Sequence, residues 1–229
     1  MTNHLTFSLL SGALSIGIFV SSFAYGQTAQ FLNKTIQTND EQTVSFAKQT
    51  LMDRLFGFEQ FSAAFTQQVI DEEKNIIQEG QGNLAVKKPN LVYWQTTSPE
   101  ETLIVSDGAT LWFYDPFIEQ ASAYQVNASV ADTPILLLTS TDPTLWRKYS
   151  VSQSGGDSFL IHSNDANSRV QTLELQFLSG SSTLKQFSLL DSTGQLSLIQ
   201  LSNVDSTSEI EPSLFQFILP EGSDLDDQR

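Results

Sequence analysis

Short apolar segments separated by turn residues follow one another along most of this 229-residue chain. Apolar and polar residues alternate within them, a pattern typical of β-strands, because successive side chains of a strand point to opposite faces of the sheet. Asp107-Gly108 is a typical hairpin turn, and Pro89 stands where a strand should end. The sequence therefore predicts a mainly antiparallel β fold. Strands are expected at residues 61–70, 76–88, 90–96, 103–106, 110–114, 120–126, 149–154, 158–162, 173–177, 184–190, 196–204 and 214–218.

Three segments follow a helical pattern instead. Residues 44–55 place apolar side chains such as Leu51 and Leu55 on one face of an amphipathic helix. Residues 133–139 and 142–149 each begin with a capping residue followed by proline, which is typical of the first turn of a helix. We expect two short helices there.

The strand series contains no internal repeat and no boundary that would divide it, so we expect a single domain over residues 44–229. Twisted strands in meander order curl towards a barrel, and three helices are too few to form a second layer over the sheet. The expected fold is an incomplete antiparallel β-barrel that encloses an apolar cavity, covered by the helices.

The amino terminus has the layout of a signal peptide. Leu5 to Val20 is apolar and uncharged, and small residues Ala24 and Gly26 precede a cut after residue 26. A transmembrane anchor is the alternative, but the apolar run is shorter than the roughly 20 residues needed to span a bilayer. We interpret residues 1–26 as a cleaved signal and 27–43 as a loose leader, so that the mature protein is exported.

The strand and helix patterns select a set of apolar side chains that would face the interior. Taken one by one, these residues could simply form a core; together, in a barrel of this strand number, they could line a ligand site. The candidate lining consists of Phe61, Phe65, Leu84, Val86, Val92, Trp94, Leu103, Val105, Trp112, Ile135, Leu136 and Leu138.

Other site chemistries have little support in the sequence. The chain lacks cysteine, which excludes disulfides and thiolate sites, and its net charge of −15 disfavours nucleic acid. Ser45 and Lys48 match the spacing of acyl enzymes but lack the companion motifs. His162 is the one histidine after residue 26, and a lone histidine cannot form a metal site. We expect no catalytic residue, metal site or cofactor.

Three blocks resemble a known family. Gly80–Trp94, Val105–Gln120 and Asp226–Arg229 are similar to the LolA family of periplasmic carriers of outer-membrane lipoproteins, and residues 133–149 fall at that family's lid helices. The resemblance covers residues 44–229 and is weaker in the carboxyl-terminal half. It implies a monomeric, non-enzymatic periplasmic chaperone that takes lipoproteins by their acyl chains from an ATP-driven exporter in the inner membrane. It would pass them to an outer-membrane receptor.

Lys88 departs from the family pattern. The family has an arginine at this position that bonds carbonyls of the lid and holds it shut, and lysine keeps the charge but loses the planar fork of donors. We expect Lys88 to serve as a similar, weaker latch; the alternative is that it only reaches to water at the rim.

Three alternative functions are compatible with the sequence. The same scaffold could carry another apolar ligand or a glycolipid, and an exported hydrolase is disfavoured because no catalytic constellation is present. A structural or adhesive exported domain would have neither ligand nor open cavity.

Overall fold

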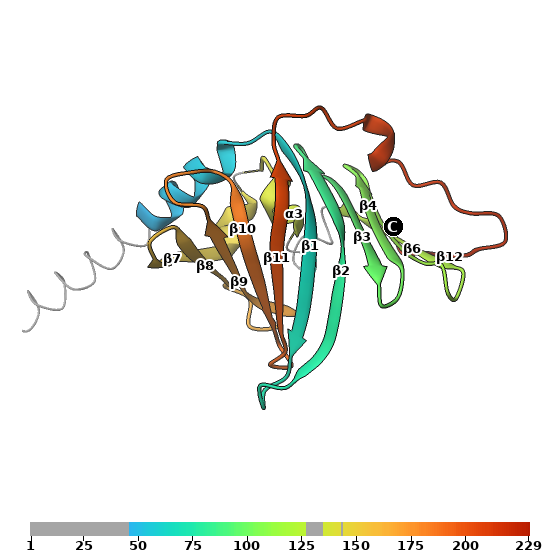
Figure 1. Cartoon of the computed structure of the whole chain (residues 1–229), viewed down its shortest axis with the longest axis horizontal. Helices are drawn as coiled ribbons and strands as arrows, with labels where there is room; N and C mark the ends of the chain where they lie inside the picture. Colours follow the sequence, from blue (N-terminus) through green and yellow to red (C-terminus); the bar gives the residue numbers. More distant parts are fainter. Residues whose placement is uncertain (1–45, 127–134, 143) are drawn as a thin grey trace, which may run out of the picture. The chain divides into compact units, whose positions relative to one another are not determined.

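The computed structural model describes residues 46–126, 135–142 and 144–229, which all belong to one compact unit (Figure 1). The predicted signal peptide and leader lie outside the described residues. Most of the described chain forms one twelve-stranded sheet. Its strands are β1 Gln60–Ile70, β2 Ile76–Lys87, β3 Leu91–Ser98, β4 Thr102–Asp107, β5 Thr110–Asp115, β6 Gln120–Gln125, β7 Tyr149–Gly155, β8 Ser158–Ser163, β9 Val170–Phe177, β10 Leu184–Asp191, β11 Leu196–Asp205 and β12 Asp224–Asp227.

The sheet is open, with β12 and β7 as its two edges. The strand order is β12-β6-β5-β4-β3-β2-β1-β11-β10-β9-β8-β7, so β1 pairs with both β2 and β11 and joins two meanders. Every neighbouring pair is antiparallel except β12 and β6, which are parallel. The incomplete antiparallel barrel expected from the sequence is confirmed, with one parallel strand added at its edge.

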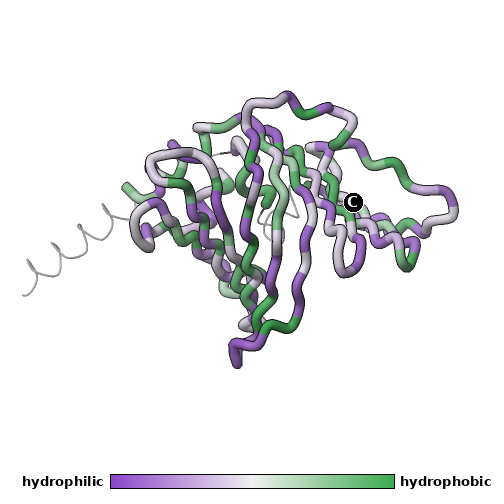
Figure 2. The backbone as a smooth tube through the Cα atoms, in the orientation of Figure 1, coloured by the Kyte–Doolittle hydropathy of each residue, from purple (hydrophilic) through white to green (hydrophobic). Residues whose placement is uncertain are grey.

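Alternating side chains explain the strands. In β1 the buried residues Phe61, Ala63 and Phe65 alternate with less buried ones, as a sheet with one covered face requires. Hydrophilic and hydrophobic residues alternate along several strands, and the tip of the β1–β2 hairpin is hydrophilic (Figure 2). In that turn the Asp71 carboxylate accepts bonds from the backbone and side-chain N–H groups of Asn75, at 2.7 and 3.1 Å.

The helical segments are short. In the described part of the chain, residues 46–56 form the first helix, and α3 Ile135–Thr139 and the 3₁₀ helix η1 Leu145–Lys148 follow β6. Both predicted helices of the 133–149 region are therefore present, the second of them shorter than expected; residues 133, 134 and 143 lie outside the described residues. Among the described residues, no helix is long and apolar enough to cross a membrane.

The carboxyl-terminal segment differs from the prediction. Residues 214–218 were expected to form a strand, but η2 Pro212–Phe215 and irregular chain occupy this region. Proline at the start of the 3₁₀ turn lacks an N–H for a ladder, and Phe215 instead packs with Ala85 and Ile210. The last strand is β12, whose acidic sequence has no apolar alternation that would have indicated it.

Candidate functional site

The two faces of the sheet are covered by different parts of the chain. On one face, here called the inner face, α3 packs against β3 and shares a buried cluster with Val92. On the opposite, outer face, η2 packs against β3 and β4 and shares a second cluster with Tyr93. Since neighbouring residues of a strand point to opposite faces, Val92 and Tyr93 fix which side chains belong to which face.

The helix α3 is buried on all sides. Its sequence Ile-Leu-Leu-Leu-Thr has no charged residue, and Leu136, Leu137 and Leu138 are each no more than 2% exposed. A helix that is apolar all round must be enclosed to be stable. Its carboxyl end is hydrogen-bonded to the turn after β2, because the backbone N–H of Asn90 donates to the Thr139 carbonyl at 3.3 Å. Side chains of α3 thus occupy the middle of the inner face.

The helix formed by residues 46–56 covers the same face with one apolar stripe. Ala47, Leu51 and Leu55 are at most 4% exposed and belong to the inner-face cluster. Lys48, on the same helix, donates to the carbonyl of Trp146 and, at 3.2 Å, to that of Tyr149. The helix is therefore attached both to the apolar face and to the η1–β7 junction.

Aromatic side chains line the inner face near these helices. The ring centroids of Phe65 and Trp94 are 4.2 Å apart, and Trp94 meets Phe187 edge-on at 6.1 Å. Phe58 and Phe61 meet edge-on at 5.3 Å, where the first helix enters β1. Large aromatic surfaces contribute much of the apolar area of a core or a ligand site.

Lys88 directly follows the last residue of β2 and is only 8% exposed. Its Nζ donates to the carbonyl oxygens of Leu55 at 2.6 Å and Phe58 at 2.7 Å, and it lies 4.4 Å from the centroid of the Phe58 ring. The last carbonyls of a helix lack intrahelical partners, and a cation is favoured there. Lys88 therefore caps the carboxyl end of the helix formed by residues 46–56.

Burial shifts the acid–base equilibrium of this lysine. Desolvation lowers the pKa of the Lys88 ammonium, and the nearby Glu59 carboxylate opposes the shift. The carbonyl partners also differ from the expected ones. The latch was expected on the lid helices of the 133–149 region, whereas the Lys88 side chain bonds the end of the first helix and only the Asn90 backbone bonds α3.

Most of the predicted lining residues gather on the inner face. They share one cluster with the covering helices, which makes them suitable to contact an apolar ligand once the helices move. These residues are Phe61, Phe65, Leu84, Val86, Val92, Trp94, Ile135, Leu136 and Leu138.

Leu103, Val105 and Trp112 lie on the opposite face, contrary to the prediction. In the β3–β4 register Val105 is opposite Tyr93, and in the β4–β5 register Trp112 is opposite Val105. The ring of Trp112 stacks on Phe217 of the carboxyl-terminal segment, with centroids 5.0 Å apart. The prediction assigned the wrong alternate residues of β4 to the inner face. Both faces of this strand are apolar, so its sequence pattern does not distinguish them.

The sequence reasoning also missed part of the inner face. Ile104 and Phe113, neighbours of the misassigned residues, pack against the inner-face cluster. The strands β7–β11 add further buried residues, and those of β8 and β9 alternate along the strand, a signal that could have found them. The added residues are Val151, Phe159, Ile161, Leu173, Leu175, Phe177, Leu184, Phe187 and Ile199.

The helices fill the inner face in this structure, and hollows occur towards its margins. One of about 340 Å³ lies at the ends of β4–β6 and is lined by, among others, Ile104, Phe113 and Ile118. Another of about 300 Å³ is lined by residues that include Phe58 and Phe61 at the end of the first helix. Ligand binding deeper on this face requires the helices to move.

Comparisons with known proteins agree with this architecture. An outer-membrane lipoprotein carrier protein of Photorhabdus laumondii is 40% identical over 183 residues, covering 80% of this chain and 89% of its own length. One of Glaesserella parasuis is 42% identical over 179 residues, covering 78% and 84%. A crystal structure of an uncharacterized conserved protein from Thermus thermophilus shares the fold, with a TM-score of 0.51 and 13% identity over 79% of this chain and 99% of that one.

The family assignment depends on a match longer than any single motif. Residues 57–218, which include the inner-face strands, α3 and the Lys88 turn, match the model of the outer membrane lipoprotein carrier protein LolA. The chain belongs to the LolA family.

Proposed function

We propose that this chain is a periplasmic carrier that binds the acyl chains of lipoproteins on its inner face. The observation that carries the proposal is the combination of a large apolar face with a cover made of the chain's own short helices. Family membership and the relatives named as lipoprotein carriers support it. In this proposal Leu84, Val86, Val92, Trp94 and the other inner-face residues of the strands contact the acyl chains, and the protein itself catalyses no reaction.

The physical need for such a face is large. Exposing an acyl chain to water costs about 0.8 kcal/mol per CH₂, so a 16-carbon chain costs on the order of 12 kcal/mol. A lipoprotein with several chains therefore cannot cross an aqueous compartment alone. An inner face that accepts the chains removes this cost for the duration of the passage.

Uptake and release follow from the cover. In the closed state Leu136, Leu137 and Leu138 of α3 occupy the inner face, and the helix formed by residues 46–56 lies over it. Cargo binding displaces these side chains, and their return helps to expel the cargo. The carrier thus needs no energy source of its own, because closing the cover offsets part of the acyl contact. Lys88 acts as a latch of the closed state in this scheme.

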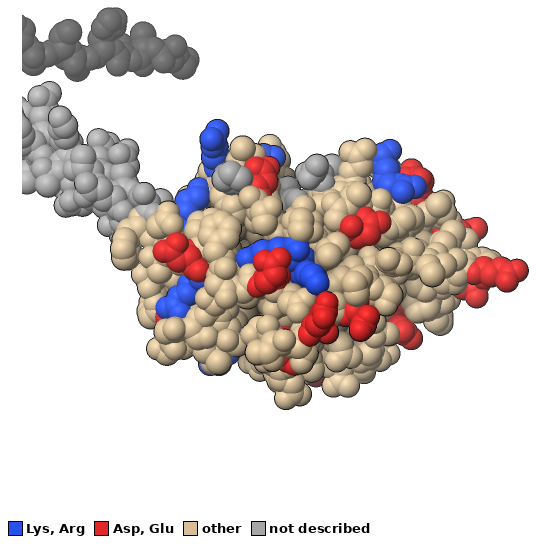
Figure 3. Space-filling model, turned by 90° about the horizontal axis from the view of Figure 1, so that it is seen from above, with Lys and Arg blue, Asp and Glu red and all other residues tan. Residues whose placement is uncertain are grey.

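The proposed partners follow from the direction of transport. An ATP-driven exporter of the inner membrane supplies the lipoprotein, and an outer-membrane receptor with a higher affinity for the acyl chains receives it. The face seen in Figure 3 carries both basic and acidic side chains, so no single sign of charge covers it. We therefore expect recognition of partners to depend on shape and apolar contact as well as on charge.

The experiment is to purify the protein from the periplasm of cells that overproduce a triacylated lipoprotein and to examine the complex by native mass spectrometry. The expected result is a one-to-one complex that is lost when the lipoprotein lacks its acyl chains. Depleting the carrier in cells should retain lipoproteins at the inner membrane. Co-purification of a glycolipid or another apolar molecule, with no lipoprotein binding, would support the alternative carrier and contradict the proposal.

A further inference from the structure

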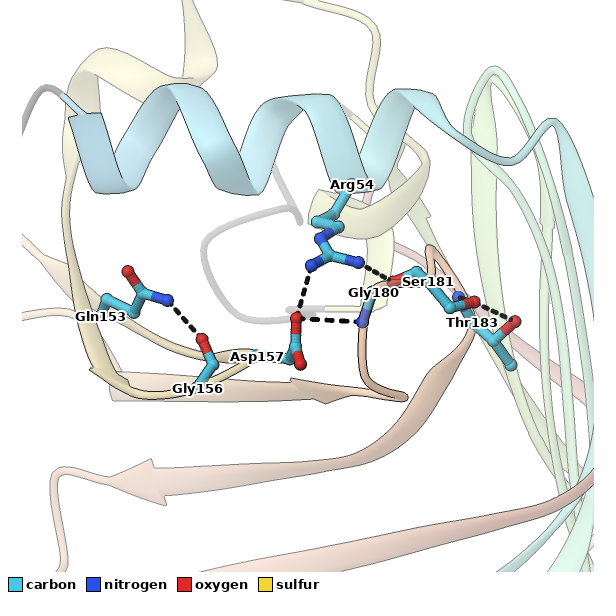
Figure 4. A network of polar contacts seen from close by, with 7 residues as sticks. All are labelled: Arg54, Gln153, Gly156, Asp157, Gly180, Ser181 and Thr183. Atoms are coloured by element: carbon cyan, nitrogen blue, oxygen red, sulfur yellow. Dashed lines mark hydrogen bonds and ion pairs between the residues drawn. The ribbon is translucent and has the colours of Figure 1, made fainter.

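Arg54 links the first helix to two turns of the sheet (Figure 4). One guanidinium nitrogen donates to the carbonyl of Ser181 and the other to the carboxylate of Asp157. The same Asp157 oxygen lies 3.4 Å from the amide nitrogen of Gly180, which donates to it. Arg54 thus uses its two-armed donor geometry to join two turns that are separate in sequence.

The two turns belong to the meander formed by strands β7–β11. Asp157 lies between β7 and β8, and Ser181 lies between β9 and β10, where the Ser181 hydroxyl donates to Thr183 at 2.9 Å. The turns are also joined to each other, because the Phe177 amide donates to the Asp157 carbonyl at 3.0 Å. Arg54 therefore binds two turns that are themselves hydrogen-bonded to each other.

This contact and the Lys88 contact secure the same helix from different parts of the sheet. Lys88 reaches the helix from β2, whereas Asp157 and Ser181 reach it from the β7–β10 meander. In between, Gly57 approaches Ser182 so closely that a Cβ would lie 1.9 Å from the Ser182 hydroxyl oxygen. The helix is thus held near its last turn by polar contacts from two separate parts of the sheet.

The Arg54–Asp157 pair has the exposure expected of a reversible contact. Both side chains are 21% exposed, so water and salt reach the pair. An ion pair of this kind is weaker than one sealed in the interior and can be broken and re-formed without stranding a buried charge. Lys88 is buried and its hydrogen bonds are to neutral carbonyls, so salt should weaken its contact less than that of the exposed pair.

We propose that Arg54 and Asp157 are positioning residues that hold the helix formed by residues 46–56 closed, and that they thereby set the affinity for acylated cargo. This inference rests on the proposed function for its second half only. The pair keeps the cover over the inner face, so weakening it raises the fraction of open molecules. Apparent affinity for a ligand that binds only the open form rises by the same factor.

The first measurement is made without cargo. Amide hydrogen exchange of the helix formed by residues 46–56 is compared among wild type, Asp157→Asn, Arg54→Gln and the double variant. Asp53→Asn is the matched control, because Asp53 lies on the same helix, is exposed and accepts only from Gln49 in the structure's hydrogen bonds. We expect several-fold faster exchange in each single variant and no change in the control. The double variant should exchange no faster than Arg54→Gln, which already loses the contacts to both Asp157 and Ser181.

Three results would overturn the proposal that the Arg54–Asp157 pair, here called the clasp, holds the helix closed. Asp157→Asn could exchange no faster than Asp53→Asn, the two single effects could add in the double variant, or amides of β1 and β2 could accelerate by the same factor as the helix. The last result would indicate general destabilisation instead of local opening. Raising the salt concentration from about 0.01 M to 1 M should reduce the difference between wild type and Asp157→Asn, since screening weakens the wild-type pair.

The second measurement adds a synthetic tripalmitoylated lipopeptide as the probe. Asp157→Asn should bind it more tightly by the factor that hydrogen exchange gives for opening, and should transfer less of it to an acceptor. Faster opening without tighter binding overturns the link to affinity but leaves the clasp itself intact. Absence of lipopeptide binding by wild type contradicts the proposed function, whereas the exchange data still decide whether Arg54 and Asp157 hold the helix.

Discussion

The ammonium of Lys88 lies 2.6 Å from the carbonyl oxygen of Leu55, so the end of the second strand holds the end of the first helix. A second bond of 2.7 Å to the carbonyl of Phe58 extends the contact into the loop that leads to β1. Both carbonyls would lose a protein partner if the lysine were removed. This buried side chain therefore fastens the carboxyl end of the helix that covers the inner face, in addition to the contacts of Lys48 and Arg54.

Replacing Lys88 with leucine should favour the open state. Leaving buried carbonyls without a donor costs about 1–3 kcal/mol, which corresponds to roughly a fivefold to hundredfold rise in opening. Lys88→Leu should bind an acylated probe more tightly and release it to an acceptor more slowly, measured by fluorescence with a labelled lipopeptide. Lys88→Arg, which can donate to both carbonyls, is the control and should stay close to wild type. Equal binding and release in Lys88→Leu and wild type would refute the latch.

Truncating α3 should separate stability from affinity. Leu136 is fully buried on the inner face, and replacing a buried leucine with alanine costs about 2–5 kcal/mol. Because this energy is lost only from the closed state, Leu136→Ala should lower the melting temperature and raise the affinity for the acylated probe. Leu214→Ala, a partly buried leucine under the outer face, is the control. It should lower stability and leave affinity unchanged, and a rise in affinity in both variants would contradict the role of α3.

Neighbouring residues of β4 should respond differently to the same substitution. Ile104 packs on the inner-face cluster, whereas Leu103 is paired with Gln95 and Tyr114 and shares the outer face with Tyr93. Burying an aliphatic side chain contributes about 1.5–3 kcal/mol, so Ile104→Ser should weaken binding of the acylated probe by roughly tenfold or more. Leu103→Ser should bind as wild type does. Calorimetric titration of both variants measures this, and the reverse order would mean that the outer face binds the cargo.

Removal of the last strand should cause self-association. β12 pairs with β6 over residues 224–227, and Gln228 donates from its backbone to the carbonyl of Ala123 at 2.8 Å. Deleting residues 224–229 uncovers the backbone of β6, and an uncovered edge strand can pair with another chain. Sedimentation should show concentration-dependent dimers or larger species for this variant. Arg229→Ala, which leaves the β12 backbone in place, should remain like wild type, and a monomeric deletion variant would contradict this function of β12.

The sequence was sufficient where one face of an element is apolar and the other polar. Phe61 and Phe65 of β1, and Leu84 and Val86 of β2, alternate with polar or small residues and were assigned to the correct face. The alternation fails in β4 and β5, since Leu103, Ile104 and Val105 are consecutive and both faces are covered. Only the pairing register, which depends on strands elsewhere in the chain, determines which of these side chains point inward.

Polar attachments were still harder to predict. The departure of Lys88 from the family arginine was visible in the sequence, but its partners are backbone carbonyls of Leu55 and Phe58, and every residue type carries a carbonyl. Arg54 and Asp157 are more than one hundred residues apart, and nothing in their local sequence links them. Such contacts follow from the meeting of distant turns, so they become visible only when the sheet topology is known.

The cover of the inner face belongs to the same chain as the face itself, and this has a consequence for transport in a dilute compartment. In the proposed scheme the leucines of α3 would compete with the acyl chains as a tethered group, whose effective concentration is set by chain geometry and is typically on the order of millimolar for short tethers. Because this competition is intramolecular, its strength does not depend on the concentration of the carrier. In this scheme the tendency of the carrier to release cargo is therefore the same at low and at high carrier concentration.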